Sequence, residues 1–220
     1  MRRAMDAFGS ALQAYAEGAR EPFYFTDKAG NAYEHPLAKY FRDPREFTRI
    51  EKRMIKLSRG RVLDVGCGTG THLPSLSKRG VALGIDISPT VIQLAKERGN
   101  KNCRVADIYK FSPRVKFDTI VLFENNIGMA GTISGARRLL KKLSSILAPD
   151  GRILTNANLT TDRYFTAVLT PRYGDKKGST FKWMTFNEET LKMLCGTAGL
   201  TMEIIDREGK ECLIQLKKRE

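Results

Sequence analysis

A glycine-rich loop gives the clearest chemical signal in this sequence. Residues 61–70 read Arg-Val-Leu-Asp-Val-Gly-Cys-Gly-Thr-Gly. The apolar residues of this segment have the pattern of a short buried strand, and the glycines predict a tight loop from which a helix then leaves. Glycine has no Cβ, so it adopts positive φ angles and lets a ligand approach the backbone closely. The segment therefore predicts a cofactor site at the end of a strand.

Acidic residues accompany three successive predicted strands. Asp64 lies in the first strand, Asp86 ends a second strand over residues 81–86, and Asp107 follows a third over 102–105. A carboxylate about 20 residues beyond a glycine loop can accept hydrogen bonds from both ribose hydroxyls. Its charge strengthens those bonds. The ordered set of three acids indicates a ligand that contains a nucleoside.

These residues together resemble the class I S-adenosylmethionine (SAM)-dependent methyltransferases, whose first motif is close to V-L-D-x-G-C-G-x-G. The resemblance covers residues 60–157 and implies SAM as the cofactor. In this family, the acid after the third strand takes the adenine amino group and an apolar neighbour packs on the ring. Cys67 is expected to be a small packing residue and not a nucleophile. The implied cofactor-binding residues are Asp64, Gly66, Cys67, Gly68, Gly70, Asp86, Ile87, Asp107 and Ile108.

The rest of the chain alternates predicted strands and helices, which favours an α/β fold with a mainly parallel sheet. The further expected elements are a helix over 90–98, a strand over 117–123, a helix over 132–147, a turn over 148–151, a strand over 152–157, a helix over 187–198, and strands over 201–206 and 211–217. The last two strands resemble the antiparallel edge of the methyltransferase fold. The resemblance thus implies a doubly wound, seven-stranded, mostly parallel sheet with an antiparallel C-terminal hairpin and helices on both faces.

We expect a single domain, because 220 residues and 24.7 kDa suit one core. Residues 1–58 are expected to form an N-terminal helical and aromatic cap, with a helix that begins at 43–44. The resemblance implies that residues 59–220 form a methyltransferase domain, with a substrate-side insertion at 158–186. In the family, such additions build the acceptor pocket.

Residues 123–128 follow the fourth strand, where the family's geometry would place the transferred methyl group. That methyl is already electrophilic, so the enzyme mainly aligns the reactants and excludes water. Amino-methylating members carry an (Asp/Asn/Ser)-Pro-Pro-(Tyr/Phe) motif here, and this chain lacks the prolines. Asn125 or Asn126 could accept a hydrogen bond from the acceptor or cap the next turn. Glu124 could act as a base, contact the cofactor or form a salt bridge.

The formal net charge of +14 and pI of about 9.8 suggest a polyanionic partner. Apolar residues recur at helical spacing after Pro44, and basic residues fall on the opposite side. In the insertion, basic and aromatic residues are interleaved. RNA-binding proteins use cationic side chains to bind phosphates and aromatic rings to stack on bases. A basic surface that is only solvated would have the same residue composition. The substrate-binding candidates are Tyr24, Tyr33, Arg45, Arg49, Lys52, Lys56, Arg163, Arg172 and Trp183.

The first functional hypothesis is a SAM-dependent methyltransferase of ribosomal or transfer RNA that modifies an exocyclic amine, most narrowly cytosine N4 of ribosomal RNA. A base in such a reaction must leave its stack, most cheaply from a single-stranded loop. A small-molecule N- or O-methyltransferase is a second hypothesis, and a SAM-binding RNA assembly factor is a third. We expect no DNA partner, and the sequence leaves the oligomeric state open.

The four cysteines, Cys67, Cys103, Cys195 and Cys212, form no Cys-x-x-Cys pair, which argues against a metal site and for reduced thiols. No apolar run approaches the length of a membrane span. The first ten residues lack the apolar stretch of a secretory signal. We therefore expect a cytoplasmic protein without a membrane partner.

Overall fold

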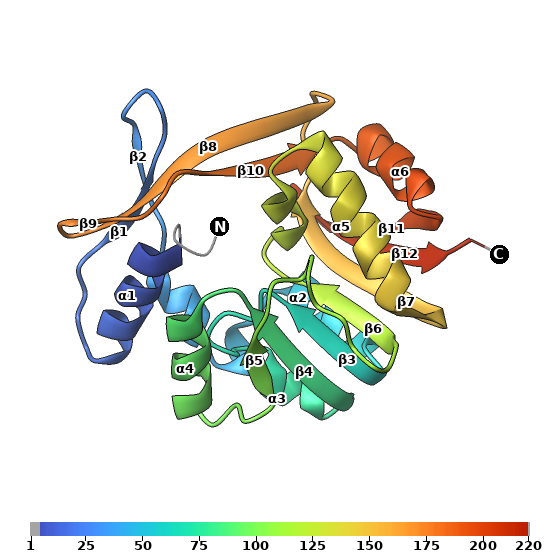
Figure 1. The fold of residues 1–220 in the computed structure, drawn as a ribbon, viewed down its shortest axis with the longest axis horizontal. Coiled ribbons are helices and arrows are strands. Elements are labelled where there is room, and N and C mark those ends of the chain that lie inside the picture. The colour runs from blue at the N-terminus through green and yellow to red at the C-terminus, as the bar shows by residue number, and fades with distance from the viewer. Residues whose placement is uncertain (1–4, 220) are drawn as a thin grey trace.

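A seven-stranded sheet runs through the molecule (Figure 1). The computed structural model describes residues 5–219, and the strand order is β11-β12-β7-β6-β3-β4-β5. The strands are β3 (Gly60–Val65), β4 (Gly80–Asp86), β5 (Cys103–Val105), β6 (Phe117–Leu122), β7 (Leu147–Asn158), β11 (Leu200–Glu208) and β12 (Glu211–Lys218). Strands β3 to β7 pair in parallel, whereas β12 pairs antiparallel with both β7 and β11. The predicted fold class is confirmed.

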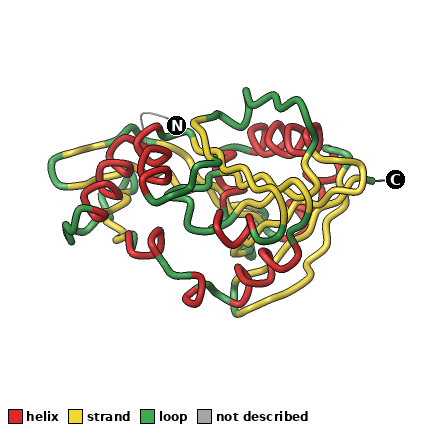
Figure 2. Tube along the Cα trace, turned by 90° about the horizontal axis from the view of Figure 1, so that it is seen from below, coloured by secondary structure: helices red, strands yellow, loops and turns green. Residues whose placement is uncertain are grey.

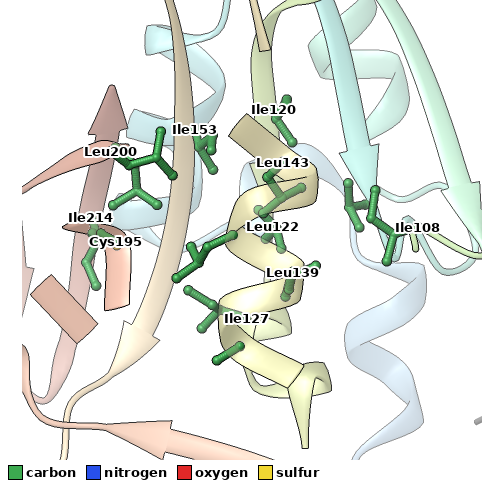
Figure 3. Close-up of a cluster of buried hydrophobic side chains, with 14 of the residues drawn as sticks. Ile108, Ile120, Leu122, Ile127, Leu139, Leu143, Ile153, Cys195, Leu200 and Ile214 are labelled. Carbon is green, nitrogen blue, oxygen red and sulfur yellow. The ribbon is translucent and has the colours of Figure 1, made fainter. Parts of the chain in front are cut away.

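Helices cover both faces of this sheet because side chains along a strand alternate between faces. In β6, Ile120 and Leu122 pack with Leu139 and Leu143 of α5 (Figure 3), whereas Val121 joins the core on the other face. The helices on the first face are α5 (Ile133–Ile146) and α6 (Glu188–Thr197); those on the second are α2 (Arg49–Leu57), α3 (Leu73–Ser77) and α4 (Pro89–Glu97).

A second sheet, in the order β10-β8-β1-β2, joins two segments that are far apart in the sequence. Its strands are β1 (Phe23–Thr26), β2 (Ala32–Glu34), β8 (Tyr164–Tyr173), β9 (Lys176–Lys177), which pairs with β8, and β10 (Phe181–Phe186). Pairing of Phe23 with Tyr173 links the N-terminal segment to the insertion. Helix α1 (Met5–Ala16) packs between this sheet and α4, at the end of the molecule opposite α6 (Figures 1 and 2).

Glycine at position 9 allows α1 to approach the start of α4. A Cβ on Gly9 would lie 3.1 Å from the Thr90 Cβ and 3.3 Å from the Ser88 Oγ, closer than most Cβ contacts. The short contact fixes α1 directly beside the segment that follows Asp86. Phe8 is thereby held next to Tyr40, with ring centroids 5.1 Å apart.

Two boundary predictions are wrong. The helix expected from 43–44 is only a 3-10 turn, η3 (Pro44–Glu46), and α2 begins at Arg49. Asp43 and Thr48 each form a capping box, so two consecutive caps divide one expected helix into two elements. The turn expected over 148–151 is instead the start of β7, which begins at Leu147 and has a register irregularity opposite β6.

The helix predicted over 187–198 agrees with α6. The Asn187 side chain caps that helix by accepting a hydrogen bond from the Thr190 amide at 2.8 Å. Within residues 5–219, no helix is both long and apolar enough to cross a membrane. The same residues contain no group of three or more metal-binding side chains.

Candidate active site

A cavity of about 630 Å³ lies between the two sheets, at the carboxyl ends of β3, β4 and β6. One wall is made by the glycine loop and the residues that follow β4, β5 and β6. The opposite wall comes from α1, the second sheet and the 3-10 turn η2 (Leu37–Phe41). The volume is within the range of small-ligand sites in proteins.

The glycine loop has a conformation that other residues would strain. Gly66, Gly68 and Gly70 have φ angles of 77°, 55° and 76°. A Cβ on Gly66 would lie 2.5 Å from the Asn126 Nδ2 atom, which donates hydrogen bonds to the Val65 and Gly66 carbonyls at 3.2 Å. Asn126 therefore braces the loop and also lines the cavity.

Asp86 joins the end of β4 to this loop. Its carboxylate accepts hydrogen bonds from the Ser88 amide at 2.9 Å and from the Gly68 amide at 3.2 Å. Burial raises the pKa of Asp86, and these amide donors oppose the rise. The side chain lines the cavity, so oxygen lone pairs are available to ribose hydroxyls. Asp107 and Ile108 lie in the same wall, where an adenine would follow the ribose.

Asp64 is a buried carboxylate without a hydrogen-bond partner in the part of the chain that the structure describes. Burial raises its pKa to about 7, although the nearby His72 acts in the opposite direction. Such a group behind the glycine loop fits a positively charged ligand, because a nearby cation offsets the cost of burying the carboxylate.

The Asp64→Asn variant is expected to be more stable than the parent by about 4 kcal/mol at pH 8, but not at pH 4. The folded-state pKa of Asp64 exceeds the unfolded-state value, so its carboxyl destabilises the protein as pH rises from about 4 through about 7. Urea unfolding at several pH values tests this. An unchanged slope of stability against pH would show that Asp64 does not titrate as described.

A chain of charged side chains connects η2 to residues that follow β6 and the glycine loop. Lys39 binds Glu124 at 2.9 Å, and Arg42 contacts Glu124 at 3.3 Å and Glu51 at 2.6 Å. The Nε2 atom of His72 lies 2.9 Å from the Glu51 carboxylate. All of these residues except Glu51 line the cavity. The chain thus holds cations and one carboxylate around the ligand.

Glu51 is 1% exposed and connects Arg42 to His72 in this series of charged side chains. Burial alone would raise its pKa, but hydrogen bonds from His72, the Thr48 amide and Arg42 outweigh burial and lower the pKa to about 2. His72 is also stacked on Phe123, with ring centroids 3.8 Å apart. No pattern in the sequence points directly to Glu51, because it belongs to a helix whose basic residues dominate the pattern.

Aromatic side chains make the far end of the cavity. Phe25 and Phe181 have ring centroids 5.7 Å apart, and Phe181 and Trp183 6.2 Å apart. Phe8 joins this wall from α1. Phe181 and Trp183 are two residues apart in β10, which puts both rings on one face of that strand.

His35 and Tyr40 form the polar part of this end, with the His35 Nε2 atom 2.8 Å from the Tyr40 hydroxyl. Burial, aided by the charge of Lys39, lowers the pKa of His35 to about 3, so its imidazole is neutral near pH 7. The Tyr40 carbonyl accepts hydrogen bonds from the Thr69 and Thr71 hydroxyls. Tyr40 therefore ties η2 to the glycine loop.

The structure brings most of the predicted cofactor residues together and separates most of the predicted substrate residues from them. Lining the cavity are Gly66, Cys67, Gly68, Asp86, Ile87, Asp107, Ile108, Glu124, Asn126 and Trp183. Asp64 in β3, Gly70 in the glycine loop and Asn125 in the turn after β6 are outside its lining. Also outside the lining are Tyr24, Tyr33, Arg45, Arg49, Lys52, Lys56, Arg163 and Arg172. Residues that the sequence did not single out, among them Phe8, Phe25, Lys39 and Tyr40, take their place.

Two of the basic residues in α2 have acidic partners. Arg49 and Arg53 both bind Asp206 in β11, and the Lys52 ammonium donates to the Arg45 carbonyl at 2.8 Å. Arg45 pairs with Asp43 at 2.9 Å. The predicted basic stripe is thus partly neutralised within the chain itself.

Residues 62–151 match the family model described as a methyltransferase domain. Two similar curated proteins are both named ubiquinone biosynthesis O-methyltransferase. The one from Bradyrhizobium diazoefficiens is 27% identical over 143 residues, which are 61% of this chain and 55% of that protein. The one from Coxiella burnetii is 28% identical over 126 residues, 54% of this chain and 50% of that protein. The chain thus spans about half the length of the curated relatives it matches.

Solved structures share the whole fold. A SAM-dependent methyltransferase from Bacteroides fragilis, in complex with S-adenosyl-L-homocysteine, superposes with a TM-score of 0.89 at 24% identity and covers 100% of this chain and 98% of that one. A sugar N-methyltransferase from Streptoalloteichus superposes with a TM-score of 0.63 at 18% identity. That match covers 87% of this chain and 96% of that one. Residues 62–151 therefore resemble a methyltransferase domain in sequence, and the chain has the fold of the class I SAM-dependent methyltransferases.

Proposed function

We propose that this enzyme methylates an oxygen or nitrogen atom of a small organic molecule with an aromatic or apolar body. The observation that carries the proposal is the convergence of Phe8, Phe25, Phe181 and Trp183 on the cavity that the glycine loop opens into. Rings in such a wall favour a flat or apolar ligand. The names of the relatives, an O-methyltransferase of ubiquinone biosynthesis and a sugar N-methyltransferase, support a small acceptor.

The chain's residues fit the parts of SAM, which supplies an electrophilic methyl group when bound. Asp86 would accept hydrogen bonds from the ribose hydroxyls, and Asp107 and Ile108 would meet the adenine. Arg42, which lines the same cavity, would be the cation available to the methionine carboxylate. The neighbouring Asp64 balances the positive charge.

Glu124 is the group suited to orient the acceptor. Lys39 and Arg42 both bind its carboxyl group, whose oxygens can also accept a hydrogen bond from a ligand. A hydrogen bond donated to Glu124 by the O–H or N–H of the methyl acceptor would orient a lone pair of that oxygen or nitrogen toward the methyl group. Bound SAM would supply the methyl group, and Glu124 would receive the proton that the acceptor loses and pass it to solvent. Neutral His35 and the Tyr40 hydroxyl can bind a second polar group of the acceptor.

The RNA hypotheses have less support. The candidate residues for phosphate binding are outside the cavity lining, and Arg49 is already paired with Asp206. RNA methylation and a role in RNA assembly can be distinguished experimentally from methylation of a small molecule. An RNA substrate would give a steep loss of affinity with salt, because each phosphate contact releases counterions.

The direct test is to incubate the purified protein with methyl-labelled SAM and a cell extract that has been separated into RNA, protein and small-molecule fractions. We expect label in the small-molecule fraction, extractable into organic solvent. Label that stays with RNA and is lost on ribonuclease treatment would overturn the proposed acceptor class.

Trp183→Ala is expected to lower kcat/KM for that acceptor by about 10- to 100-fold, because a side chain of this size contributes about 1.5–3 kcal/mol when it is buried against a ligand. S-adenosylhomocysteine affinity should change less than about threefold, since the change is at the far end of the cavity. Tyr164→Ala is the matched control, because Tyr164 lies on the other face of the same sheet and is 49% exposed. Equal loss in both variants would contradict the assignment of this wall.

A further inference from the structure

The turn that carries Glu124 has an unusual backbone. Among residues 5–219, Glu124 and Asn125 are the non-glycine residues with positive φ, both at 55°. Side chains with a Cβ disfavour this conformation, and two in succession persist only when their surroundings hold them. Backbone strain of this kind is found preferentially at functional sites. Here it occurs at the end of β6, where the Glu124 side chain enters the cavity wall.

Asn156 in β7 holds this turn through both its side chain and its backbone. Its Oδ1 atom accepts a hydrogen bond from the Glu124 amide at 2.9 Å, and its carbonyl accepts one from the Asn125 amide at 3.1 Å. The side chain is 3% exposed. The two donors are consecutive amides, so a single residue fixes both strained positions.

Glu211 in β12 fixes the orientation of Asn156 in turn. The Asn156 Nδ2 group donates to the Glu211 carboxylate, which leaves the Oδ1 atom facing the Glu124 amide. Strands β6, β7 and β12 are neighbours in the sheet, so the contacts form a line across three strands that ends at the cavity. Glu211 itself does not line the cavity.

We propose that Asn156 is a positioning residue for methyl transfer, which, with Glu211, holds the Glu124 turn so that its carboxylate faces the reacting atoms. The inference rests on the proposed role of Glu124 in orienting the acceptor. It also defines the acceptor further, because a carboxylate held in this way serves an attacking atom that carries a hydrogen, such as a hydroxyl or an amine. Asn156 acts only through Glu124 and does not touch the ligands.

The test uses two cofactor analogues and needs no acceptor. Sinefungin carries an amine in place of the methylsulfonium group of SAM, whereas S-adenosylhomocysteine has neither the methyl nor an amine there. A correctly aimed Glu124 should accept a hydrogen bond from that amine and favour sinefungin. We expect Glu124→Gln and Asn156→Ala each to reduce the ratio of sinefungin to S-adenosylhomocysteine affinity by about tenfold or more, as removal of a charge-assisted hydrogen bond does.

Exchanging the amide of residue 156 and the carboxylate of residue 211 distinguishes a positioning role from a general loss of packing. In Asn156→Asp, the new carboxylate faces that of Glu211, and the affinity ratio should fall. Adding Glu211→Gln lets the glutamine amide donate to the new carboxylate, which still accepts from the Glu124 amide, so the double variant should recover the ratio to within about threefold of the parent. Asn158→Ala, two residues along the same strand and exposed, should leave the ratio unchanged. Thermal unfolding and S-adenosylhomocysteine binding confirm that each variant folds.

Two results would overturn the proposal. One is a parental affinity ratio in Asn156→Ala or Glu124→Gln, and the other is a folded double variant that does not recover the ratio. Because the ratio is measured without an acceptor, it is independent of the labelling experiment. Label in RNA would overturn the small-molecule acceptor alone, and an unchanged ratio with label in the small-molecule fraction would overturn the positioning role alone.

Discussion

Replacing Asp86 by alanine is expected to weaken SAM binding by about 100-fold or more, because the two ribose hydrogen bonds to a charged acceptor contribute about 1.5–3 kcal/mol each. The same carboxylate also accepts from the Gly68 amide in the glycine loop and from the Ser88 amide before α4, and the variant loses both bonds. Titration calorimetry with SAM and with S-adenosylhomocysteine measures the loss directly. Both ligands should be affected equally, since both carry the ribose.

The control for this change is Asp150→Ala, which removes an exposed carboxylate on the first part of β7. It should leave affinity within about twofold, as surface substitutions usually do. Asp86→Asn gives a second comparison, because an amide keeps one oxygen acceptor but loses the charge. Parental affinity in Asp86→Ala would remove this residue from the cofactor site.

Glu51→Gln is expected to lower the free energy of unfolding by about 3–5 kcal/mol, since it breaks a buried ion pair and leaves Arg42 without its closest partner. Urea unfolding at pH 7 measures the effect. S-adenosylhomocysteine binding should also weaken, because Arg42 and His72 both line the cavity. Glu203→Gln, at an exposed position of β11, is the matched control and should change stability by about 0.5 kcal/mol or less.

The low pKa of Glu51 also determines how stability depends on pH. The folded-state pKa of Glu51 is about 2, below its ordinary value, so its contribution is complete above the ordinary value and is lost as pH falls toward 2. The loss amounts to about 3 kcal/mol across that interval. The Glu51→Gln variant lacks this titration and should show a shallower acid limb. Identical acid limbs would contradict the low pKa.

The central fold could be predicted because its signals are local. Buried runs such as 117–123, the loop glycines and the Asn187 cap each depend on a few adjacent residues. The boundaries at 43–49 and 147–152 were wrong because two capping boxes and a long strand with a register irregularity produce patterns close to those of a helix and a turn. The cofactor-binding residues could be predicted for the same reason, since they lie in one loop and at three strand ends.

The acceptor side could not be predicted in this way. Phe25 and Phe181 are brought together by a sheet that pairs residues about 150 positions apart in the sequence. No local sequence pattern predicts such a pairing. Charge was also misleading as a guide to position. Basic residues were counted as a surface for a polyanion, whereas the salt bridges of Arg42 and Arg49 are intramolecular and depend on acids in other elements.

The second sheet has a consequence for how the enzyme forms and diversifies. Its β1–β8 pairing must close a long loop, so it is expected to form late in folding, after the main sheet has collapsed on its helices. Substitutions in a late-forming layer alter unfolding more than folding rates. Both of its segments also flank the stretch that matches the methyltransferase model. Mutations there can change which acceptor is selected while the donor half still folds and binds SAM, so new substrates can be acquired without rebuilding the nucleus of the fold.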